Sequence, residues 1–244
     1  MSKIDLRGTL GLPIIYDGEN LILKDAEYQE KLIVSIDQMR DQLLNKELDC
    51  PDIFYTKYKQ IDTNGLFSSK KLKLNIYIMK PNLAGIEYVK TRATRCAKYP
   101  RIFEVLLGST TILIQRYKSP KDNRVVKVQA KKGNKIIVPA GYDFVATNPR
   151  QSSTLILAEV MYIKAISRIT LDEQSGIAYY VIRKNAKQEI VRNPNYKIVN
   201  EVEFEDISSV VKKYGITPKT TITKQVIRKY EKFDWLFKED SINI

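Results

Sequence analysis

The sequence between residues 53 and 184 is divided into many short segments rich in β-branched and aromatic residues, and this pattern most limits the folds available to the chain. Examples are KLKLNIYIMK (71–80), TTILIQRY (110–117) and STLILAEVMYIKA (153–165). Turn-forming clusters at 63–65, 119–123 and 132–134 separate the segments. Many short strands at regular spacing are typical of a β-sandwich or β-barrel. We therefore predict a mainly β fold.

Two of these segments also indicate how their strands are buried. KLKLNIYIMK alternates between polar and apolar residues, which predicts one buried face and one face in water. STLILAEVMYI is almost continuously apolar. It predicts a strand that lies between two packed layers.

The flanking regions have a different character. Residues 1–20 contain several turn residues and predict an extended arm. Residues 25–48 predict a helix that Asp25 caps and that ends before Pro51. Its helically spaced apolar residues are Leu32, Ile33, Ile36, Met39, Leu43 and Leu44. We expect an N-terminal arm and helix (1–50), a β domain (51–197) and a C-terminal helical extension (198–244).

The C-terminal extension predicts two helices joined near Thr217 and Pro218, with Pro218 in the first turn of the second helix. Its basic residues resemble those of a helix-turn-helix and would contact nucleic acid or another partner. They are Lys212, Lys213, Lys219, Lys224, Arg228 and Lys229. The preferred interpretation is instead that the helices pack on the β domain or on a second subunit. Their apolar anchor would be Phe233, Trp235, Leu236 and Phe237.

Composition restricts the chemistry. The formal net charge is +13, which favours anionic partners, although a lysine-rich surface that only serves solubility explains it equally well. The chain has no histidine, which excludes histidine-ligated metals and histidine-activated nucleophiles. Cys50 and Cys96 form no spacing pattern and are interpreted as reduced thiols. We see no signal peptide or membrane span and expect a cytoplasmic protein.

Several segments carry a resemblance to a known family. They are GIEYVKTR (85–92), PRIFEVLLG (100–108), NKIIVPAGYDFVATN (134–148), GIAYYVIR (176–183) and NPNYK (193–197). In this order they resemble the archaeal cupin-type glucose-6-phosphate isomerases over residues 35–197. SIDQMR (35–40) is similar to a short entry motif of that family. The resemblance implies a cupin fold, a double-stranded β-helix or jelly-roll barrel, which agrees with the strand pattern.

The resemblance also implies where a metal would be held. The family binds a divalent metal in the mouth of the barrel through histidines and a glutamate. In this chain Thr94 and Cys96 stand at two of the histidine positions, and Phe144 stands at the third. Arg101 stands at the position of the glutamate and would repel a metal ion. We therefore expect no metal and no cofactor.

Other positions of the family's site also have counterparts. Thr91 matches a threonine on the phosphate side, and Ser167 and Ile169 align with a histidine and a tyrosine on the substrate side. Tyr142 is expected either to close the pocket or to cap the core.

The stretch 91–101 is rich in cations besides Arg101, and Arg92, Arg95 and Lys98 are candidates for binding an anion. The competing interpretation is a solvated charged surface.

Three functions remain open at this point. The preferred one is a metal-free, non-catalytic binding or regulatory protein that recognises an anion such as a sugar phosphate and forms a homodimer through sheet edges. The second is an isomerase that uses Glu104 or Glu159 as its base, although we expect both to face solvent. The third is a nucleic-acid or ribonucleoprotein partner that uses the C-terminal helices.

Overall fold

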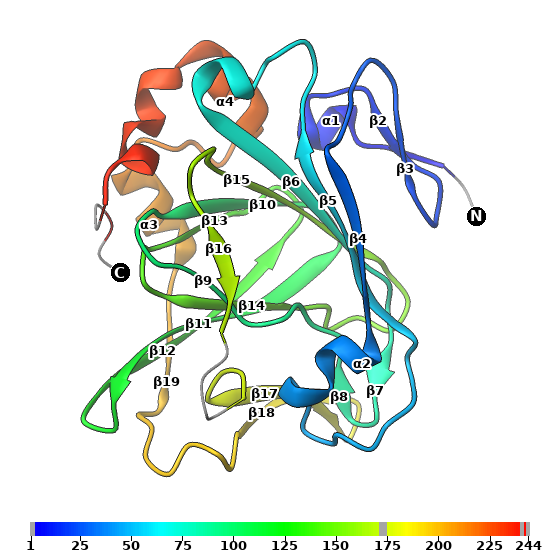
Figure 1. The fold of residues 1–244 in the computed structure, drawn as a ribbon, viewed down its shortest axis with the longest axis vertical. Coiled ribbons are helices and arrows are strands. Elements are labelled where there is room, and N and C mark those ends of the chain that lie inside the picture. The colour runs from blue at the N-terminus through cyan, green and yellow to red at the C-terminus, as the bar shows by residue number, and fades with distance from the viewer. Residues whose placement is uncertain (1–2, 171–174, 240–241, 243–244) are drawn as a thin grey trace.

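The computed structural model describes residues 3–170, 175–239 and 242 of the chain. Most of the regular structure is antiparallel sheet, as predicted (Figure 1). Two six-stranded sheets face each other, and two smaller sheets and the helices lie around them. In the described part of the chain, no recorded strand pairing joins the two large sheets into a closed barrel.

The first large sheet has the strand order β13-β10-β15-β6-β5-β4. Its strands are β13 (Lys135–Val138), β10 (Arg101–Leu107), β15 (Leu155–Tyr162), β6 (Leu72–Met79), β5 (Ile53–Ile61) and β4 (Glu30–Ser35). Neighbouring strands are antiparallel throughout. One edge of this sheet is therefore β4.

The second large sheet has the order β16-β9-β14-β11-β12-β19. Its strands are β16 (Ser167–Ile169), β9 (Thr94–Cys96), β14 (Asp143–Thr147), β11 (Ser109–Ser119), β12 (Asp122–Lys131) and β19 (Val202–Phe204). Only the β12–β19 pair is parallel among the described pairings of this sheet. Its edge strand β16 is short.

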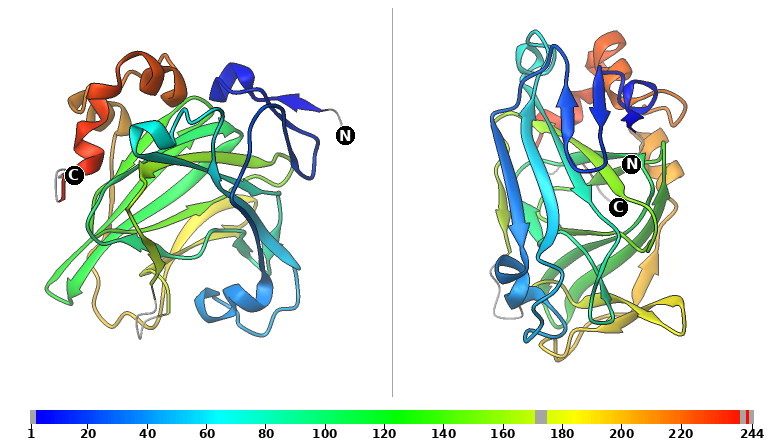
Figure 2. Two further views of the ribbon diagram at one scale, coloured as in Figure 1. Left: turned by 45° about the horizontal axis from the view of Figure 1, so that its top comes forward. Right: turned by 90° about the vertical axis from the view of Figure 1, so that its right-hand side faces the viewer.

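Two apolar clusters cover the two faces of the first sheet. One cluster lies between the two large sheets and contains Phe103, Leu157 and Ile112. The other covers the opposite face of the first sheet, where Ile76 and Ile156 meet the N-terminal arm and the C-terminal helices. Figure 2 shows the N-terminal arm and the C-terminal helices over the same end of the sheets. The prediction that β15 lies between two layers is confirmed.

The prediction for β6 was wrong. Both of its faces are buried, because the alternate residues that were expected in water, Asn75 and Tyr77, point into a buried polar network described below. In β6, the alternation of polar and apolar residues therefore reflects a buried polar layer and not a solvent-exposed face.

The predicted helix over 25–48 was also wrong. Leu32 and Val34 pack inward from β4, which pairs with β5, and only Ile36–Met39 form a helix, α2, followed by η1 (Arg40–Gln42). The cap is Ser35, whose side chain and that of Gln38 form a capping box. Asp25 has a φ of 57° and lies outside any helix. Sheet pairing outweighed the helical spacing.

The N-terminal arm was predicted to be extended, but it is a compact unit packed on the core. It folds into a three-stranded sheet of β1 (Ile4–Asp5), β2 (Ile14–Tyr16) and β3 (Leu21–Leu23), with the short helix α1 (Arg7–Leu10). A four-stranded sheet covers the outer face of the second large sheet. It contains β7 (Leu83–Ala84), β8 (Glu87–Tyr88), β17 (Tyr179–Lys184) and β18 (Lys187–Arg192).

The C-terminal extension forms two helices, as predicted, α3 (Ile207–Lys213) and α4 (Ile222–Arg228), followed by η3 (Tyr230–Phe237). Phe233, Trp235 and Leu236 are buried against the first sheet, which confirms the apolar anchor. Pro218 does not lie in the first turn of α4. Thr221 is the cap of α4 instead, and its hydroxyl accepts a hydrogen bond from the Lys224 N–H. None of the described helices is long and apolar enough to span a bilayer.

Candidate functional site

A cavity of about 240 Å³ lies where the edge strands of the two large sheets approach each other. Leu32 and Val34 of β4 line it together with Ser167 and Ile169 of β16. Its polar lining consists of basic, hydroxyl and amide side chains and contains no carboxylate among the described residues. These side chains are Lys57, Lys59, Arg92, Tyr55, Tyr77, Thr91, Thr94, Ser167 and Gln38.

Arg101 of β10 lies directly beneath this lining, and its side chain is fully buried. Its Nη1 donates to the Thr94 hydroxyl at 3.2 Å, to the Ser167 hydroxyl at 3.1 Å and to Glu159 at 3.3 Å. Its Nη2 donates to the Thr94 carbonyl at 3.0 Å. The guanidinium therefore ties β9, β15 and β16 together from inside the molecule.

Phe144 occupies the remaining space beside Arg101. Its ring stacks on Phe103 with centroids 4.1 Å apart and planes 10° apart. The Arg101 guanidinium lies 5.3 Å from the Phe144 centroid and 5.6 Å from that of Phe103, within the range of a cation–π contact. The two aromatic rings thus stabilise the buried guanidinium through their π faces.

Glu159 of β15 is the anionic centre of this layer and is fully buried. It accepts hydrogen bonds from Asn75 at 2.8 Å and Tyr77 at 2.9 Å, and it pairs with Lys57 at 3.2 Å and with Arg101 at 3.3 Å. Burial alone would raise the pKa of Glu159, but these cations and donors lower it to about 2. The expectation that Glu159 faces solvent was wrong.

Lys57 and Tyr77 complete the network. Lys57 donates to the Tyr77 hydroxyl and its ammonium lies 4.3 Å from the centroid of that ring. Burial lowers the pKa of Lys57, and burial together with the Glu159 charge raises the pKa of Tyr77 well above its ordinary value. Both side chains also line the cavity. They connect the buried ionic layer to the space in which a ligand would lie.

Glu104, the other candidate base, is also buried, so the expectation that it faces solvent was wrong. It pairs with Lys135 at 2.9 Å and accepts the Ile222 N–H at 2.8 Å. Burial raises its pKa. It is not part of the cavity lining, and it anchors the start of α4 on the first sheet.

The structure brings several of the predicted residues together. Thr94, Ser167 and Phe144 meet at Arg101 and line the cavity, as does Ile169. Thr91 also lines the cavity, and its hydroxyl accepts the Ala146 N–H at 3.0 Å, which holds it against β14.

Cys96 and Tyr142 do not line the cavity. Cys96 is buried beside Met161 and Ala165, and burial raises the pKa of its thiol. Tyr142 belongs to the core cluster between the sheets and lies next to Arg116, whose guanidinium is 5.9 Å from its ring centroid. Of the two expectations for Tyr142, this position agrees with a core cap.

Only one of the three candidate anion-binding cations near Arg101 reaches the cavity. Arg92 lines it and pairs with Asp41 at its edge, at 2.8 Å. Arg95 makes two hydrogen bonds, of 2.9 and 2.6 Å, to the buried Asp143. Lys98 is exposed on the outer side, 3.5 Å from Glu239.

The sequence analysis did not identify the cavity residues of β5. Tyr55, Lys57 and Lys59 all line the cavity. They are alternate residues of one strand, so their side chains lie on the same face, and this spacing of two could have indicated a shared site. Lys59 pairs with Glu30 at 2.9 Å, but this carboxylate is half exposed and is not part of the lining.

The residues at the positions of the family's metal ligands do not fit a divalent metal. A metal needs lone-pair donors, whereas Arg101 offers only N–H donors and Phe144 offers none. Thr94 already interacts with Arg101 through both its hydroxyl and its carbonyl oxygen. Among the residues that the structure describes, no group of three or more cysteine, aspartate or glutamate side chains is placed to hold a metal ion.

The two facing antiparallel sheets, with a polar site between their edges, define a cupin fold. A profile of the family described as Glucose-6-phosphate isomerase (GPI) matches residues 42–199. The chain therefore belongs to the glucose-6-phosphate isomerase family, and the resemblance seen in the sequence is confirmed. A comparison with curated proteins found no match.

Solved structures with a similar fold are more distant. They include an oxalate oxidase in complex with glycolate (11% identity, TM-score 0.35, covering 41% of this chain and 46% of that one). They also include an oxalate decarboxylase from Bacillus subtilis (14%, 0.37, 47% and 28%) and a vicilin from Capsicum annuum (14%, 0.37, 47% and 30%). This chain thus spans less than half the length of each of these three proteins.

Proposed function

We propose that this protein is a metal-free binding member of the glucose-6-phosphate isomerase family, and that it holds a small anion, such as a sugar phosphate, in the cavity between β4 and β16. The observation that carries the proposal is the lining of the cavity, which contains Lys57, Lys59 and Arg92 and no carboxylate among the described residues. The polar side chains that an anion would meet there are cations, hydroxyls and the Gln38 amide.

The donors of the lining suit a phosphate and a sugar in different ways. Arg92 pairs through one nitrogen with Asp41 and keeps other N–H groups for a second acceptor. Lys59 also lines the cavity, and its ammonium is a compact charge on a flexible stem. The hydroxyls of Tyr55, Thr91 and Ser167 are the kind of groups that hydrogen-bond to a polyol.

The buried ionic layer supports binding without turnover. Proton transfer between sugar carbons needs a base with a pKa near the working pH. Glu159 has a pKa of about 2 and both of its oxygens interact with neighbouring side chains, so it is a weak base with little freedom to move. Glu104 anchors α4 and lies outside the cavity lining.

A thermal-unfolding series tests the proposal. Melting temperature is measured with increasing glucose 6-phosphate, fructose 6-phosphate, inorganic phosphate and unphosphorylated glucose, because a ligand that binds the folded state raises it. We expect shifts with the phosphorylated compounds after treatment with a chelator, and none with glucose at the same concentration.

Variants locate the site in the same assay. Arg92→Gln and Lys59→Gln should each reduce the shift that the sugar phosphates produce. Lys118→Gln removes an exposed cation that is absent from the lining and should leave the shift unchanged. No shift with any phosphorylated compound at millimolar concentration, or equal losses in all three variants, would refute the proposal.

A further inference from the structure

A second group of basic residues lies outside the cavity lining. Many exposed cations pair with a carboxylate, such as Arg7 with Asp5 and Lys184 with Glu189. Other exposed cations, on several parts of the surface, take part in no ion pair with the described residues. Six of these are Lys71, Lys164, Arg168, Lys224, Arg228 and Lys229.

Hydrogen bonds link the segments that carry these residues, and we call this group the basic strip. Arg228 and Lys229 end α4, and the next residue, Tyr230, donates to the Lys70 carbonyl at 2.7 Å. Lys71 follows, and its carbonyl accepts the Ile163 N–H at 2.8 Å. The strip therefore passes from α4 over the turn at 70–71 to the loop that holds Lys164.

The strip continues into a groove of about 440 Å³ on the outer side of β9 and β16. Lys164, Arg168 and Lys98 line this groove together with Tyr99 and Ile166. Ile166 is 64% exposed and adds apolar surface to the lining. The groove thus combines an apolar floor with cations around it.

The face of α4 that points away from the core agrees with this arrangement. Lys224, Ile227 and Arg228 occupy positions i, i+3 and i+4, so they share one face, and all three are exposed. The acidic residues nearest in the chain, Glu231 and Asp234, belong to η3 and are exposed. Glu239 is 3.5 Å from Lys98 at the groove.

We propose that the basic strip binds single-stranded nucleic acid. A line of unpaired cations matches the repeating phosphates of a nucleic-acid backbone, whose binding releases counterions. The groove beside Tyr99 and Ile166 offers an apolar and aromatic surface on which an unstacked base can lie, and a duplex keeps its bases stacked and paired. This function is separate from the sugar-phosphate proposal, because the strip and the cavity differ in their basic residues.

Fluorescence anisotropy with a labelled, mixed-sequence single-stranded oligonucleotide and with its duplex tests the inference. We expect tighter binding of the single strand and a steep loss of affinity with salt, with a slope of about −0.7 per phosphate contacted. Duplex binding as tight as that of the single strand, or no binding at low salt, would overturn it.

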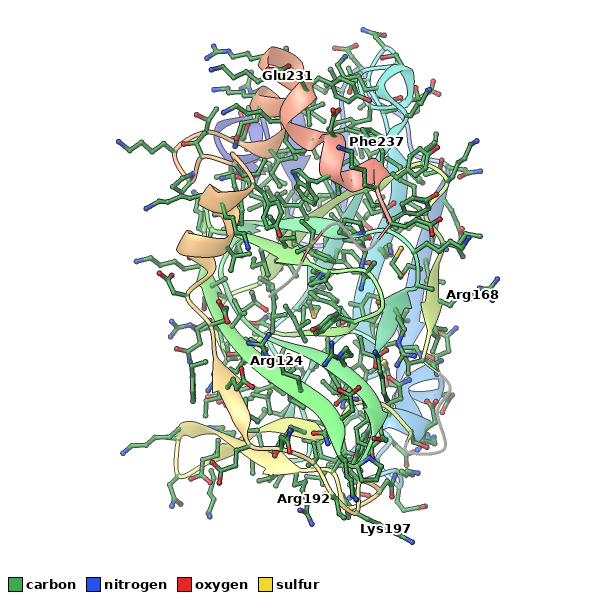
Figure 3. The ribbon with its side chains drawn as sticks, turned by 90° about the vertical axis from the view of Figure 1, so that its left-hand side faces the viewer. Arg124, Arg168, Arg192, Lys197, Glu231 and Phe237 are labelled. Atoms are coloured by element: carbon green, nitrogen blue, oxygen red, sulfur yellow. The ribbon has the colours of Figure 1, made fainter. Side chains whose placement is uncertain are left out.

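Charge-reversed variants place the binding on the strip. The pair Lys224→Glu and Arg228→Glu should weaken binding at least tenfold and flatten the salt dependence, and Lys164→Glu with Arg168→Glu should do the same. Figure 3 shows Arg192 and Lys197 at the end of the molecule opposite Glu231 and Phe237. Their double change to glutamate alters net charge equally and should have a much smaller effect, so equal losses in all three would contradict the inference.

Discussion

At the scale of single residues, the central feature is a buried ionic layer at the place where the family resemblance puts a metal. Arg101 and Lys57 supply positive charge, and both form ion pairs with the Glu159 carboxylate. Removing one member of such a group leaves an uncompensated buried charge, which typically costs about 3–5 kcal/mol. The layer therefore has a strict requirement for all three side chains, whatever ligand the cavity holds.

The first prediction concerns Glu159→Gln and pH. The folded pKa of Glu159 is about 2 and its ordinary value is 4.5, so the charged form stabilises the folded state above pH 4.5. This stabilisation is lost as pH falls from 4.5 towards 2, and it amounts to about 3 kcal/mol at neutral pH. Urea unfolding at neutral pH should show that Glu159→Gln is destabilised by at least this amount.

The pH dependence separates this effect from a simple loss of packing. Between pH 5 and 2 the wild-type free energy of unfolding should fall more steeply than that of Glu159→Gln. Glu189→Gln, which changes an exposed carboxylate, is the matched control and should follow the wild type. Parallel pH profiles for wild type and Glu159→Gln would contradict the account.

Part of this layer could be predicted from the sequence and part could not. The resemblance located Thr94, Arg101, Phe144 and Ser167, because these positions follow motifs that are local in the chain. Lys57 is separated from Glu159 by about a hundred residues and reaches it through the pairing of β5, β6 and β15. That register is a property of the folded sheet, and no local pattern contains it.

At the scale of elements, the errors have a common physical cause. The segment 30–35 has apolar spacing compatible with a helix, but the edge of the first sheet was available, and β4 pairs with β5 there. β6 alternates as a half-exposed strand would, yet its polar side chains are buried because they bind Glu159. Local propensity was overridden in both cases by a partner that lies elsewhere in the chain.

The second prediction concerns the turn between β10 and β11. Gly108 has a φ of 78°, and a Cβ there would lie 2.6 Å from the Thr154 carbonyl oxygen, a backbone atom that cannot rotate away. Gly133 has a similar φ of 88°, but nothing lies within 4 Å of its Cβ position. An alanine at Gly133 would therefore add backbone strain alone, whereas an alanine at Gly108 would add both backbone strain and a steric clash.

Gly133→Ala should lower the free energy of unfolding by about 1–2 kcal/mol, the usual effect of a left-handed conformation. Gly108→Ala should lower it clearly further, since the strand end must also move. Chemical denaturation of the two variants measures the difference directly. Equal effects would show that the close approach at Thr154 is relieved without cost.

At the scale of the whole molecule, the C-terminal extension is part of the fold and also presents charge. Phe233 and Leu236 bury it against the first sheet, as the sequence predicted, while most of its basic residues remain exposed. The cavity and the groove of the basic strip have no basic residue in common. Formation of a homodimer through sheet edges stays a prediction.

The most direct test of the central claim measures metal content and isomerase turnover on one sample. Purified protein is analysed for bound metals, and the conversion of glucose 6-phosphate to fructose 6-phosphate is assayed after chelation and after addition of divalent ions. The account predicts no stoichiometric metal and no turnover in either condition, together with a glucose 6-phosphate affinity that divalent ions do not change. Stoichiometric metal accompanied by metal-dependent turnover would contradict it.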